Sequence, residues 1–295
     1  MNRRRFLGAA LAAGAAAVSL PRLGRAQSLE SHVEDLVASA DGTFGVFART
    51  MAPGPALYAI NAYDSFPCAS TIKVLVMTTA FYEEERTPGV LRDRITFDRG
   101  NLIGGSDVMQ NVPDGKRMRV WDLIVPMILV SDNTAANMLI EHFGVDLINR
   151  VGAQAGMLAT HLARPFIDTP YPVTHELNVT TPYDMGTLLY QIEYGARESV
   201  PTIVSPAHCR RMIALMLRQQ DRDKIPAGLP HGVPVADKDG EITGTRNDVG
   251  IVEPFGDSPF VLSIFTKGVD DYDGALSAIR RIARATYDSI AGSDL

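Results

Sequence analysis

The pattern of hydrophobic and polar residues predicts a helix and a β-hairpin near the start of the chain. Apolar residues recur at helical spacing over 28–40, and the segment ends before Asp41 and Gly42. Residues 43–48 and 56–60 alternate as strands do, and a Pro-Gly-Pro turn separates them. We therefore expect two antiparallel neighbouring strands at this end of the chain.

The middle of the chain has the pattern of a helical region. The apolar run after Lys73 is not confined to one face, so a helix over 70–84 is predicted to be buried almost all round. A second strongly apolar helix is predicted at 120–130. The pattern stays mostly helical over 145–220, apart from a proline-containing loop at 164–181.

The pattern returns to strands towards the C-terminus. Three short β-rich segments and a final amphipathic helix are predicted at 233–238, 245–252, 260–267 and 272–290. Strands at both ends of the chain favour one antiparallel sheet that carries the terminal helices, with the middle helices in a second lobe.

The fold class that follows is α/β of the α+β type, with an antiparallel five-stranded sheet flanked by helices plus an all-helical lobe. We place the sheet lobe at about 27–65 and 228–295 and the helical lobe at about 66–227. A boundary between two lobes is a common position for a ligand-binding cleft.

Residues 1–26 have the composition of an export signal. Three arginines, Arg3 to Arg5, precede Phe6 and Leu7, and an apolar segment rich in alanine and glycine follows. The small residues Gly24 and Ala26 stand where a signal peptidase would cut. The arginine pattern resembles a twin-arginine signal, and an ordinary secretory signal remains the alternative. Either reading predicts a periplasmic or secreted protein without membrane association after cleavage.

Composition and charge limit the kinds of molecule that this protein is expected to bind. The 295 residues are 46% hydrophobic and carry a net charge of −6, which is ordinary for a globular protein. No basic run interleaved with aromatics follows the N-terminus, so we expect no nucleic-acid partner. Cys68 and Cys209 lie in apolar helical contexts and are predicted to be buried free thiols. The six histidines do not have the spacing of metal ligands, so we predict no metal site. We also expect no cofactor and a monomeric protein.

One short motif carries chemistry. Ser70 stands at a predicted helix start and Lys73 three residues later, on the same helix face. Burial disfavours a charged lysine, which lets its amine act as a base towards the serine hydroxyl. Taken alone, the motif also fits a capped helix that happens to contain a lysine.

Two further motifs follow in chain order: Ser131-Asp132-Asn133 and Lys238-Asp239-Gly240. Together with S-x-x-K they resemble the S-x-x-K, S-D-N and K-T-G set of the penicillin-recognising serine hydrolases, most closely the class A β-lactamases and their less characterised relatives. The resemblance covers essentially all of the chain after residue 26, and it implies a β-lactamase/transpeptidase-like fold.

The resemblance implies roles in acylation. Ser70 is the nucleophile that forms an acyl-enzyme, and Lys73 is the base. The backbone N–H groups of Ser70 and Glu241 form the oxyanion hole. Ser131 passes the proton to the leaving nitrogen, although a helix cap is its alternative role.

The remaining implied residues bind substrate. Asn133 holds the substrate's amide side chain, or is a satisfied turn residue. Lys238, at the end of a strand facing the serine, keeps the site positive. The other predicted contacts are Asn178, Asp239, Gly240, Thr245 and Arg246.

The loop that supplies a water-activating glutamate departs from the family pattern E-x-x-L-N. Thr174 occupies the glutamate position, while Leu177 and Asn178 fit. The nearest carboxylate is Glu176, which is either the base for deacylation or a solvated loop residue. The short interval to Thr180 predicts a trimmed loop.

The third motif departs at Asp239, where the family has threonine or serine. An ionised aspartate offers no donor to a substrate carboxylate and repels it. Arg246, eight residues after Lys238, is the carboxylate-binding arginine implied by the resemblance, or an exposed strand residue. Lys238, Arg246 and the hydroxyls of Thr243 and Thr245 would offset the repulsion. Asp239 otherwise points away or has a raised pKa.

The sequence therefore predicts a serine hydrolase that acylates Ser70, with β-lactams as substrates. Alternatives are a penicillin-binding, peptidase- or esterase-like relative with slow deacylation, and a non-catalytic sensor of β-lactams or peptidoglycan fragments. The intact serine–lysine pair argues against the sensor.

Overall fold

The computed structural model describes residues 28–166 and 176–292, so the predicted signal peptide lies outside the described residues. The first helix, α1 (Leu29–Ala38), begins at Ser28, whose hydroxyl accepts the backbone N–H of Ser31 at 3.2 Å. The predicted helix is confirmed.

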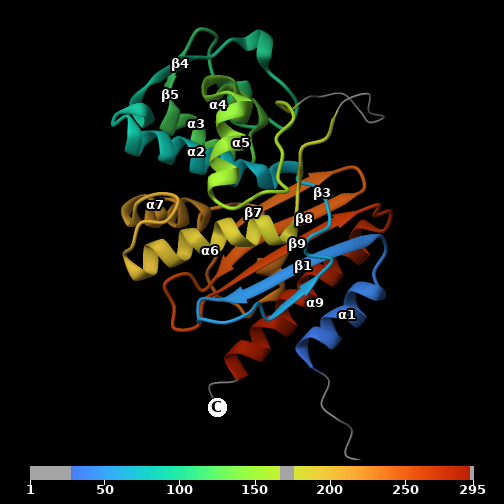
Figure 1. The fold of residues 1–295 in the computed structure, drawn as a ribbon. Helices are drawn as coiled ribbons and strands as arrows, with labels where there is room; N and C mark the ends of the chain where they lie inside the picture. Colours follow the sequence, from blue (N-terminus) through green and yellow to red (C-terminus); the bar gives the residue numbers. More distant parts are fainter. Residues whose placement is uncertain (1–27, 167–175, 293–295) are drawn as a thin grey trace, which may run out of the picture.

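A five-stranded antiparallel sheet joins the two ends of the chain, as predicted. Its order is β2-β1-β9-β8-β7, so a strand from near the N-terminus pairs with the last strand. Figure 1 shows these strands side by side in blue and orange to red. The bounds are β1 (Thr43–Thr50), β2 (Tyr58–Ile60), β7 (Val235–Ile242), β8 (Thr245–Val252) and β9 (Phe260–Lys267).

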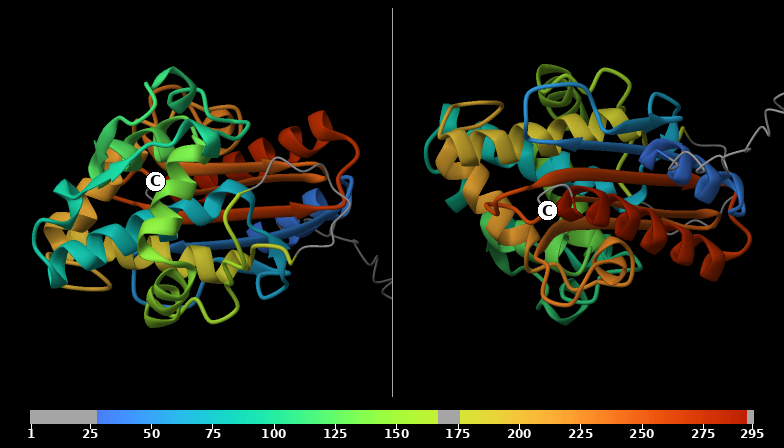
Figure 2. Two further views of the ribbon diagram at one scale, coloured as in Figure 1. Left: turned by 90° about the horizontal axis from the view of Figure 1, so that it is seen from above. Right: turned by 90° about the horizontal axis from the view of Figure 1, so that it is seen from below.

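Helices cover both faces of the sheet. On one face α1 and α9 (Tyr272–Ala291) pack against the strands, and Figure 2 shows them in front of the sheet when it is viewed from below. Val33 and Ile279 are fully buried in this layer. On the other face α6 (Pro182–Glu198) crosses β1, β8 and β9. The buried apolar residues of these helices and strands account for the sandwich of layers.

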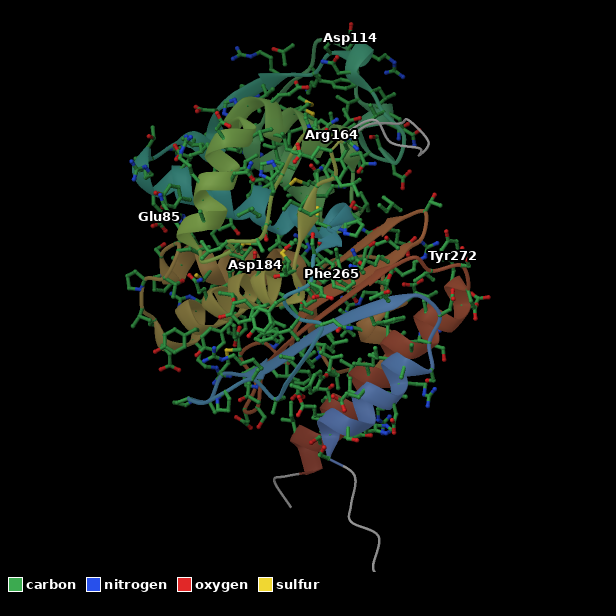
Figure 3. The ribbon with its side chains drawn as sticks, turned by 45° about the vertical axis from the view of Figure 1, so that its right-hand side comes forward. Glu85, Asp114, Arg164, Asp184, Phe265 and Tyr272 are labelled. Atoms are coloured by element: carbon green, nitrogen blue, oxygen red, sulfur yellow. The ribbon has the colours of Figure 1, made fainter. Side chains whose placement is uncertain are left out.

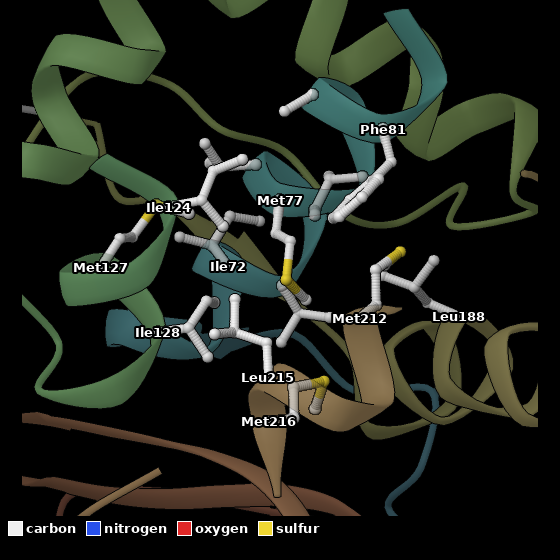
Figure 4. Close-up of a cluster of buried hydrophobic side chains, with 14 of the residues drawn as sticks. Ile72, Met77, Phe81, Ile124, Met127, Ile128, Leu188, Met212, Leu215 and Met216 are labelled. Atoms are coloured by element: carbon white, nitrogen blue, oxygen red, sulfur yellow. The ribbon is translucent and has the colours of Figure 1, made fainter. Parts of the chain in front are cut away.

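The middle of the chain forms a group of helices around α2 (Lys73–Arg86). Every residue from Lys73 to Phe81 is buried, which confirms the prediction from the two-sided apolar run. Figure 4 shows Met77 surrounded by labelled side chains of several helices, among them Ile124 and Leu215. The other helices are α3 (Val120–Leu129), α4 (Asn133–Phe143), α5 (Val145–Gln154), α7 (Pro206–Met216) and the short α8 (Ile225–Gly228).

Short elements fill the segments where the sequence shows no regular pattern. Residues 86–119 contain the hairpin β4 (Arg94–Thr96) and β5 (Arg117–Arg119), whose three-residue strands are too short to produce a periodicity. A second small ladder pairs β3 (Phe66–Pro67) with β6 (Val179–Thr180). Single 3₁₀ turns lie at η2 (Val90–Arg92), η3 (Arg99–Asn101) and η4 (Met109–Asn111).

One predicted strand boundary is wrong. Lys238 was expected at a strand end, but β7 continues to Ile242, so Lys238 lies in its middle. The ladder to β8 pairs residues 235 to 242 with residues 252 to 245, so Gly240 lies opposite Asn247 and Glu241 opposite Arg246.

The division into lobes at about 65 and 228 stays a prediction. Among the described helices, none has the length and apolar character needed to span a bilayer.

Close packing of α6 on the sheet gives a testable consequence. A Cβ added at Gly186 would lie 2.3 Å from Cδ1 of Phe47 on β1. We expect Gly186→Ala to lower the free energy of unfolding by about 1–3 kcal/mol, because overpacking shifts backbone or rotamers. Urea unfolding measures this. Gly292→Ala, where an added Cβ meets open space, is the control. Equal stabilities for the two variants would contradict the packing.

Candidate active site

Ser70 lies in a tight 3₁₀ turn that leads into α2. This turn, η1 (Ala69–Ile72), follows Cys68, whose backbone N–H donates to the carbonyl of Asn178 at 2.9 Å. Ala69 has φ 46°, in the left-handed region that side chains with a Cβ rarely adopt. Strained backbone of this kind is concentrated at functional sites. The turn presents Ser70 at the N-terminal end of a long buried helix.

Lys73 gathers the polar groups of the first two motifs around its amine. Its Nζ lies 3.0 Å from Ser70 Oγ, 2.6 Å from the carbonyl oxygen of Ser131, 3.1 Å from Ser131 Oγ and 2.7 Å from Oδ1 of Asn133. The lysine is fully buried. The S-x-x-K and S-D-N motifs therefore meet at one nitrogen, as the sequence predicts.

The environment of Lys73 favours its neutral form. Burial, and after it the charge of Lys238, hold the pKa of Lys73 well below the ordinary lysine value. A neutral amine has two N–H groups and one lone pair. The carbonyl of Ser131 and Oδ1 of Asn133 carry no hydrogen and can accept the two N–H groups. The lone pair can then accept from the hydroxyl of Ser70 or of Ser131, which lie 3.0 and 3.1 Å from Nζ. The ring of Phe166 lies over Nζ, 4.6 Å from it to the ring centroid.

Ser131 is held beside Lys73 by the junction of α3 and α4. It has φ 58°, a second left-handed residue at this site. The cap of α4 is its neighbour Asp132, whose Oδ1 accepts the N–H of Ala135 at 2.9 Å and whose Oδ2 accepts the N–H of Met109 at 2.9 Å. The alternative role of Ser131 as the helix cap is therefore wrong, and its hydroxyl faces the lysine.

Asn133 links the lysine to a neighbouring loop. Its Oδ1 accepts from Lys73, and its Nδ2 donates to the carbonyl of Gly104 at 2.9 Å. Gly105 has φ +68°, and a Cβ there would lie 2.7 Å from that Nδ2, so the loop fits this amide closely. Asn133 is thus a connecting residue of the site.

Strand β7 lies directly against the turn that holds Ser70. A Cβ at Gly240 would lie 2.9 Å from the backbone nitrogen of Ser70 and 3.1 Å from the carbonyl of Cys68. Buried Asn247 on β8 ties the sheet to the same turn, because its Nδ2 donates to the carbonyl of Pro67 at 2.8 Å. The third motif therefore comes next to the nucleophile. Sequence reasoning missed Asn247, which no motif marks.

Lys238 and Asp239 form an ion pair within this motif. Lys238 Nζ donates to Oδ1 of Asp239 and, at 2.9 Å, to its carbonyl oxygen. Nε2 of Gln219 donates to the same Oδ1 at 2.8 Å. Burial acts to raise the pKa of Asp239, but the charge of Lys238 and these hydrogen bonds outweigh it and lower the pKa. The expectation that Asp239 points away or has a raised pKa is therefore wrong.

Asp239 belongs to a stripe of carboxylates on one face of β7, at alternate positions 237, 239 and 241. Each receives one donor from the segment between α7 and α8. Gln219 donates to Asp239, Arg222 to Asp237, and Lys224 to Glu241 at 2.8 Å. We call these three links the 219–224 clamp. The sequence analysis missed it, although the alternation D-x-D-x-E at 237–241 is a signal that could have indicated it.

Three carboxylates at the Lys224 end of the clamp lie close enough together to resemble a metal site. Asp221, Asp223 and Glu241 bring oxygens within 4.8 Å of one another. The ammonium of Lys224 lies between them, 3.2 Å from Asp221, 2.9 Å from Asp223 and 2.8 Å from Glu241. These contacts raise the pKa of Lys224 although burial opposes them. The trio is therefore a lysine-binding cluster.

Arg246 is the second residue of β8, and its side chain contacts Glu241 and Tyr272. It pairs across the ladder with Glu241, at 3.6 Å between side chains, and stacks on Tyr272 at 3.8 Å from ring centroid to Cζ. Its Nη1 donates to the carbonyls of Ile242 and of Thr245, which is buried. Figure 3 shows Tyr272 on the side of the sheet that carries α9. The alternative of an exposed arginine is wrong, since its side chain is 16% exposed.

Glu176, the residue predicted for deacylation, is not among the hydrogen-bond partners of Lys73. Thr174 lies outside the described residues. Glu176 is exposed, and its carbonyl accepts Nε of Arg164 at 3.2 Å. Asn178 uses its amide to close the loop base: Oδ1 accepts the N–H groups of Ala163 and Arg164, and Nδ2 donates to the carbonyl of Arg164. Figure 3 labels Arg164 near this loop.

Comparison with known proteins agrees with this geometry. A family model described as "Beta-lactamase enzyme family" matches residues 28–290. The chain belongs to this family. It is 32% identical over 282 residues to a protein of Streptomyces fradiae named Beta-lactamase, covering 90% of this chain and 89% of that protein.

Solved structures give the same relationship. A beta-lactamase from Sphaerobacter thermophilus has a TM-score of 0.78 and 30% identity, covering 88% of this chain and 97% of that one. PBP-A has a TM-score of 0.78 and 26% identity, covering 90% and 96%. The predicted β-lactamase/transpeptidase-like fold is confirmed, and the chain is a serine hydrolase of the β-lactamase family.

Buried thiols and carboxyl groups complete the surroundings. Cys68 and Cys209 are free and buried, as predicted. On β8, burial raises the pKa of Asp248 to about 7, although Lys224 and the N–H of Ile225 act against it. Its Oδ2 accepts that N–H at 2.9 Å, while Oδ1 has no hydrogen-bond partner. A raised carboxyl pKa costs folding free energy as the pH rises.

We expect Asp248→Asn to make stability less dependent on pH. The wild type loses the contribution of this group as the pH rises from about 4 to about 7, because the folded carboxyl titrates at about 7 and the unfolded one near 3.8. The variant's advantage in free energy of unfolding should grow over that range by on the order of 2–4 kcal/mol and then level off. Urea unfolding at several pH values measures it, with surface Asp288→Asn as control. A constant difference between Asp248→Asn and wild type would contradict this assignment.

Proposed function

We propose that this protein is a serine β-lactamase that opens the β-lactam amide through an acyl-enzyme on Ser70. The observation that carries the proposal is the buried amine of Lys73, 3.0 Å from Ser70 Oγ, with Ser131 and Asn133 as its other partners. The geometry supports a base that takes the Ser70 proton without a histidine.

The residues divide the reaction as follows. Ser70 Oγ attacks the carbonyl carbon while its proton moves to the lone pair of Lys73. The backbone N–H groups of Ser70 and Glu241 stabilise the oxyanion. Ser131, 3.1 Å from Lys73, passes the proton to the departing nitrogen, which completes ring opening. Asn133 and Lys238 bind the substrate on either side of the nucleophile. The other residues proposed to contact the substrate are Asn178, Gly240, Thr245 and Arg246.

Release of the acyl group requires a residue that activates water, and among the described residues the support for such a residue is weakest. Glu176, our proposed water-activating residue, has an exposed side chain at the loop base. The Phe166 ring lies over Lys73. These observations favour a second candidate, a penicillin-binding protein with slow deacylation. One structure in the comparison is titled as an acyl-enzyme complex of a PBP-A mutant with penicillin G. A peptidase- or esterase-like reaction on a peptidoglycan-like substrate would use the same acylation.

We also propose that residues 1–26 export the protein by a twin-arginine-type signal. The support is the arginine pattern and the small residues Gly24 and Ala26. The mature protein would then act as a monomer in the periplasm or outside the cell, on a small-molecule substrate.

Mass spectrometry tests acylation directly. We expect wild-type protein mixed with a penicillin to gain the mass of the intact drug, and a chromogenic cephalosporin to change colour at a rate set by deacylation. Ser70→Ala should lose the adduct completely, because it removes the hydroxyl that lies 3.0 Å from Lys73 Nζ and is the proposed nucleophile. The buried thiol control, Cys68→Ala, should keep the adduct. An adduct that persists in Ser70→Ala would show that the nucleophile is another residue.

The pH dependence of acylation tests the base. The acylation rate should fall as the pH drops through the lowered pKa of Lys73, because a protonated amine accepts no proton. Stopped-flow measurement of the acylation rate constant across pH gives the acidic limb, which should lie well below the ordinary lysine value of about 10.4. A rate that begins to fall already near that value would contradict a neutral Lys73.

A further inference from the structure

The cations around Ser70 already have carboxylate partners of their own. Fully buried Lys238 directs its ammonium to two oxygens of Asp239, Oδ1 and the backbone carbonyl. Both residues act electrostatically on Lys73, so the pair lies within range of the reacting groups. A substrate anion that enters here meets an ion pair in place of a lysine with open donors.

The position of Asp239 is fixed by more than Lys238. Gln219 donates to the same Oδ1 at 2.8 Å, and the Asp239 side chain is 10% exposed. The 219–224 clamp holds the strand on either side through Arg222 with Asp237 and Lys224 with Glu241. Rotation of Asp239 away from the site would leave the buried Gln219 amide without this acceptor, which costs free energy.

The other cations near this strand are also engaged. Lys224 contacts three carboxylates, and Arg246 stacks on Tyr272 and pairs with Glu241. Within 28–166 and 176–292, the basic side chains of β7, β8 and the clamp thus have acidic partners. This end of the site is neutralised by the protein itself.

We propose that Asp239 is a specificity-determining residue, which directs the site towards acyl donors that carry no carboxylate beside the scissile amide. The inference rests on the proposed function, since it concerns the substrate of the same serine. A carboxylate placed next to Lys238 lies beside the carboxylate of Asp239, and two like charges at close range repel each other in a partly desolvated site. An ester or amide at that position brings no charge and competes for no cation.

A matched pair of substrates tests this without relying on a variant. One is a chromogenic cephalosporin with its free ring carboxylate, and the other is its methyl ester. Acylation rate constants are measured by stopped flow and intact mass, and each is divided by the rate of hydroxide-catalysed opening of the same compound. For wild type we expect the corrected rate constant of the ester to exceed that of the acid. A corrected rate constant for the acid tenfold above that of the ester would overturn the proposal.

Variants then assign the preference to Asp239. In Asp239→Thr, the corrected ester-to-acid ratio should fall by about tenfold or more, through faster reaction of the acid. Asp239→Asn removes the charge with little change of shape and should shift the ratio in the same direction. Asp223→Asn, which removes an exposed charge of the Lys224 cluster, should leave the ratio within about twofold.

The outcomes separate this inference from the proposed function. If wild type acylates Ser70 with both compounds but the ratio is the same in Asp239→Thr and Asp239→Asn, Asp239 does not set specificity and the proposed function stands. If wild type forms no adduct with either compound, the proposed function fails and this inference fails with it. A shift of the ratio in Asp223→Asn as large as in Asp239→Thr would assign the effect to net charge and overturn the role of Asp239.

Discussion

The structure depends on the burial of one amine. Lys73 is fully buried, and an uncompensated ammonium in such a position is costly. The protein lowers this cost by favouring the neutral form, and it supplies two acceptors without hydrogens of their own, the Ser131 carbonyl and Oδ1 of Asn133. The lone pair is then left for the hydroxyls of Ser70 and Ser131, which are the two remaining neighbours of the amine. Desolvation thus turns a common side chain into a base, and the same groups define where the nucleophile must lie.

The fold brings three distant segments to that amine. The turn η1 starts helix α2 and provides Ser70, the junction of α3 and α4 provides Ser131 and Asn133, and β7 provides the strand against which the turn packs. The sheet that carries β7 is completed by β1, from the other end of the chain. The 219–224 clamp holds β7 through the three carboxylates on one face of that strand. The nucleophile and its strand therefore keep their spacing only if both ends of the chain are folded.

Much of the fold and of the site was predictable, because it follows from the periodicity of the sequence and the order of the motifs. The two-sided apolar run predicted the buried helix, alternation predicted β1, and β-rich composition predicted β8. The first two motifs contain the residues that meet at Lys73. The residues that were missed act through single contacts: Asn247 on the Pro67 carbonyl, Gln219 on Asp239, and Phe166 over Lys73. No spacing rule marks such contacts. Lys238 was expected to offset the charge of Asp239, and the two side chains pair directly. The alternative of a raised Asp239 pKa was wrong, because this pairing outweighs the effect of burial.

The protonation state of Lys73 in the resting protein is the central claim, and nuclear magnetic resonance measures it directly. Lysine labelled with ¹³C at Cε reports the titration of each amine, and comparison with Lys73→Met assigns the signal. The account predicts one lysine that titrates well below the ordinary value of about 10.4 and disappears in that variant. A Lys73 signal that titrates at or above the ordinary value would contradict it.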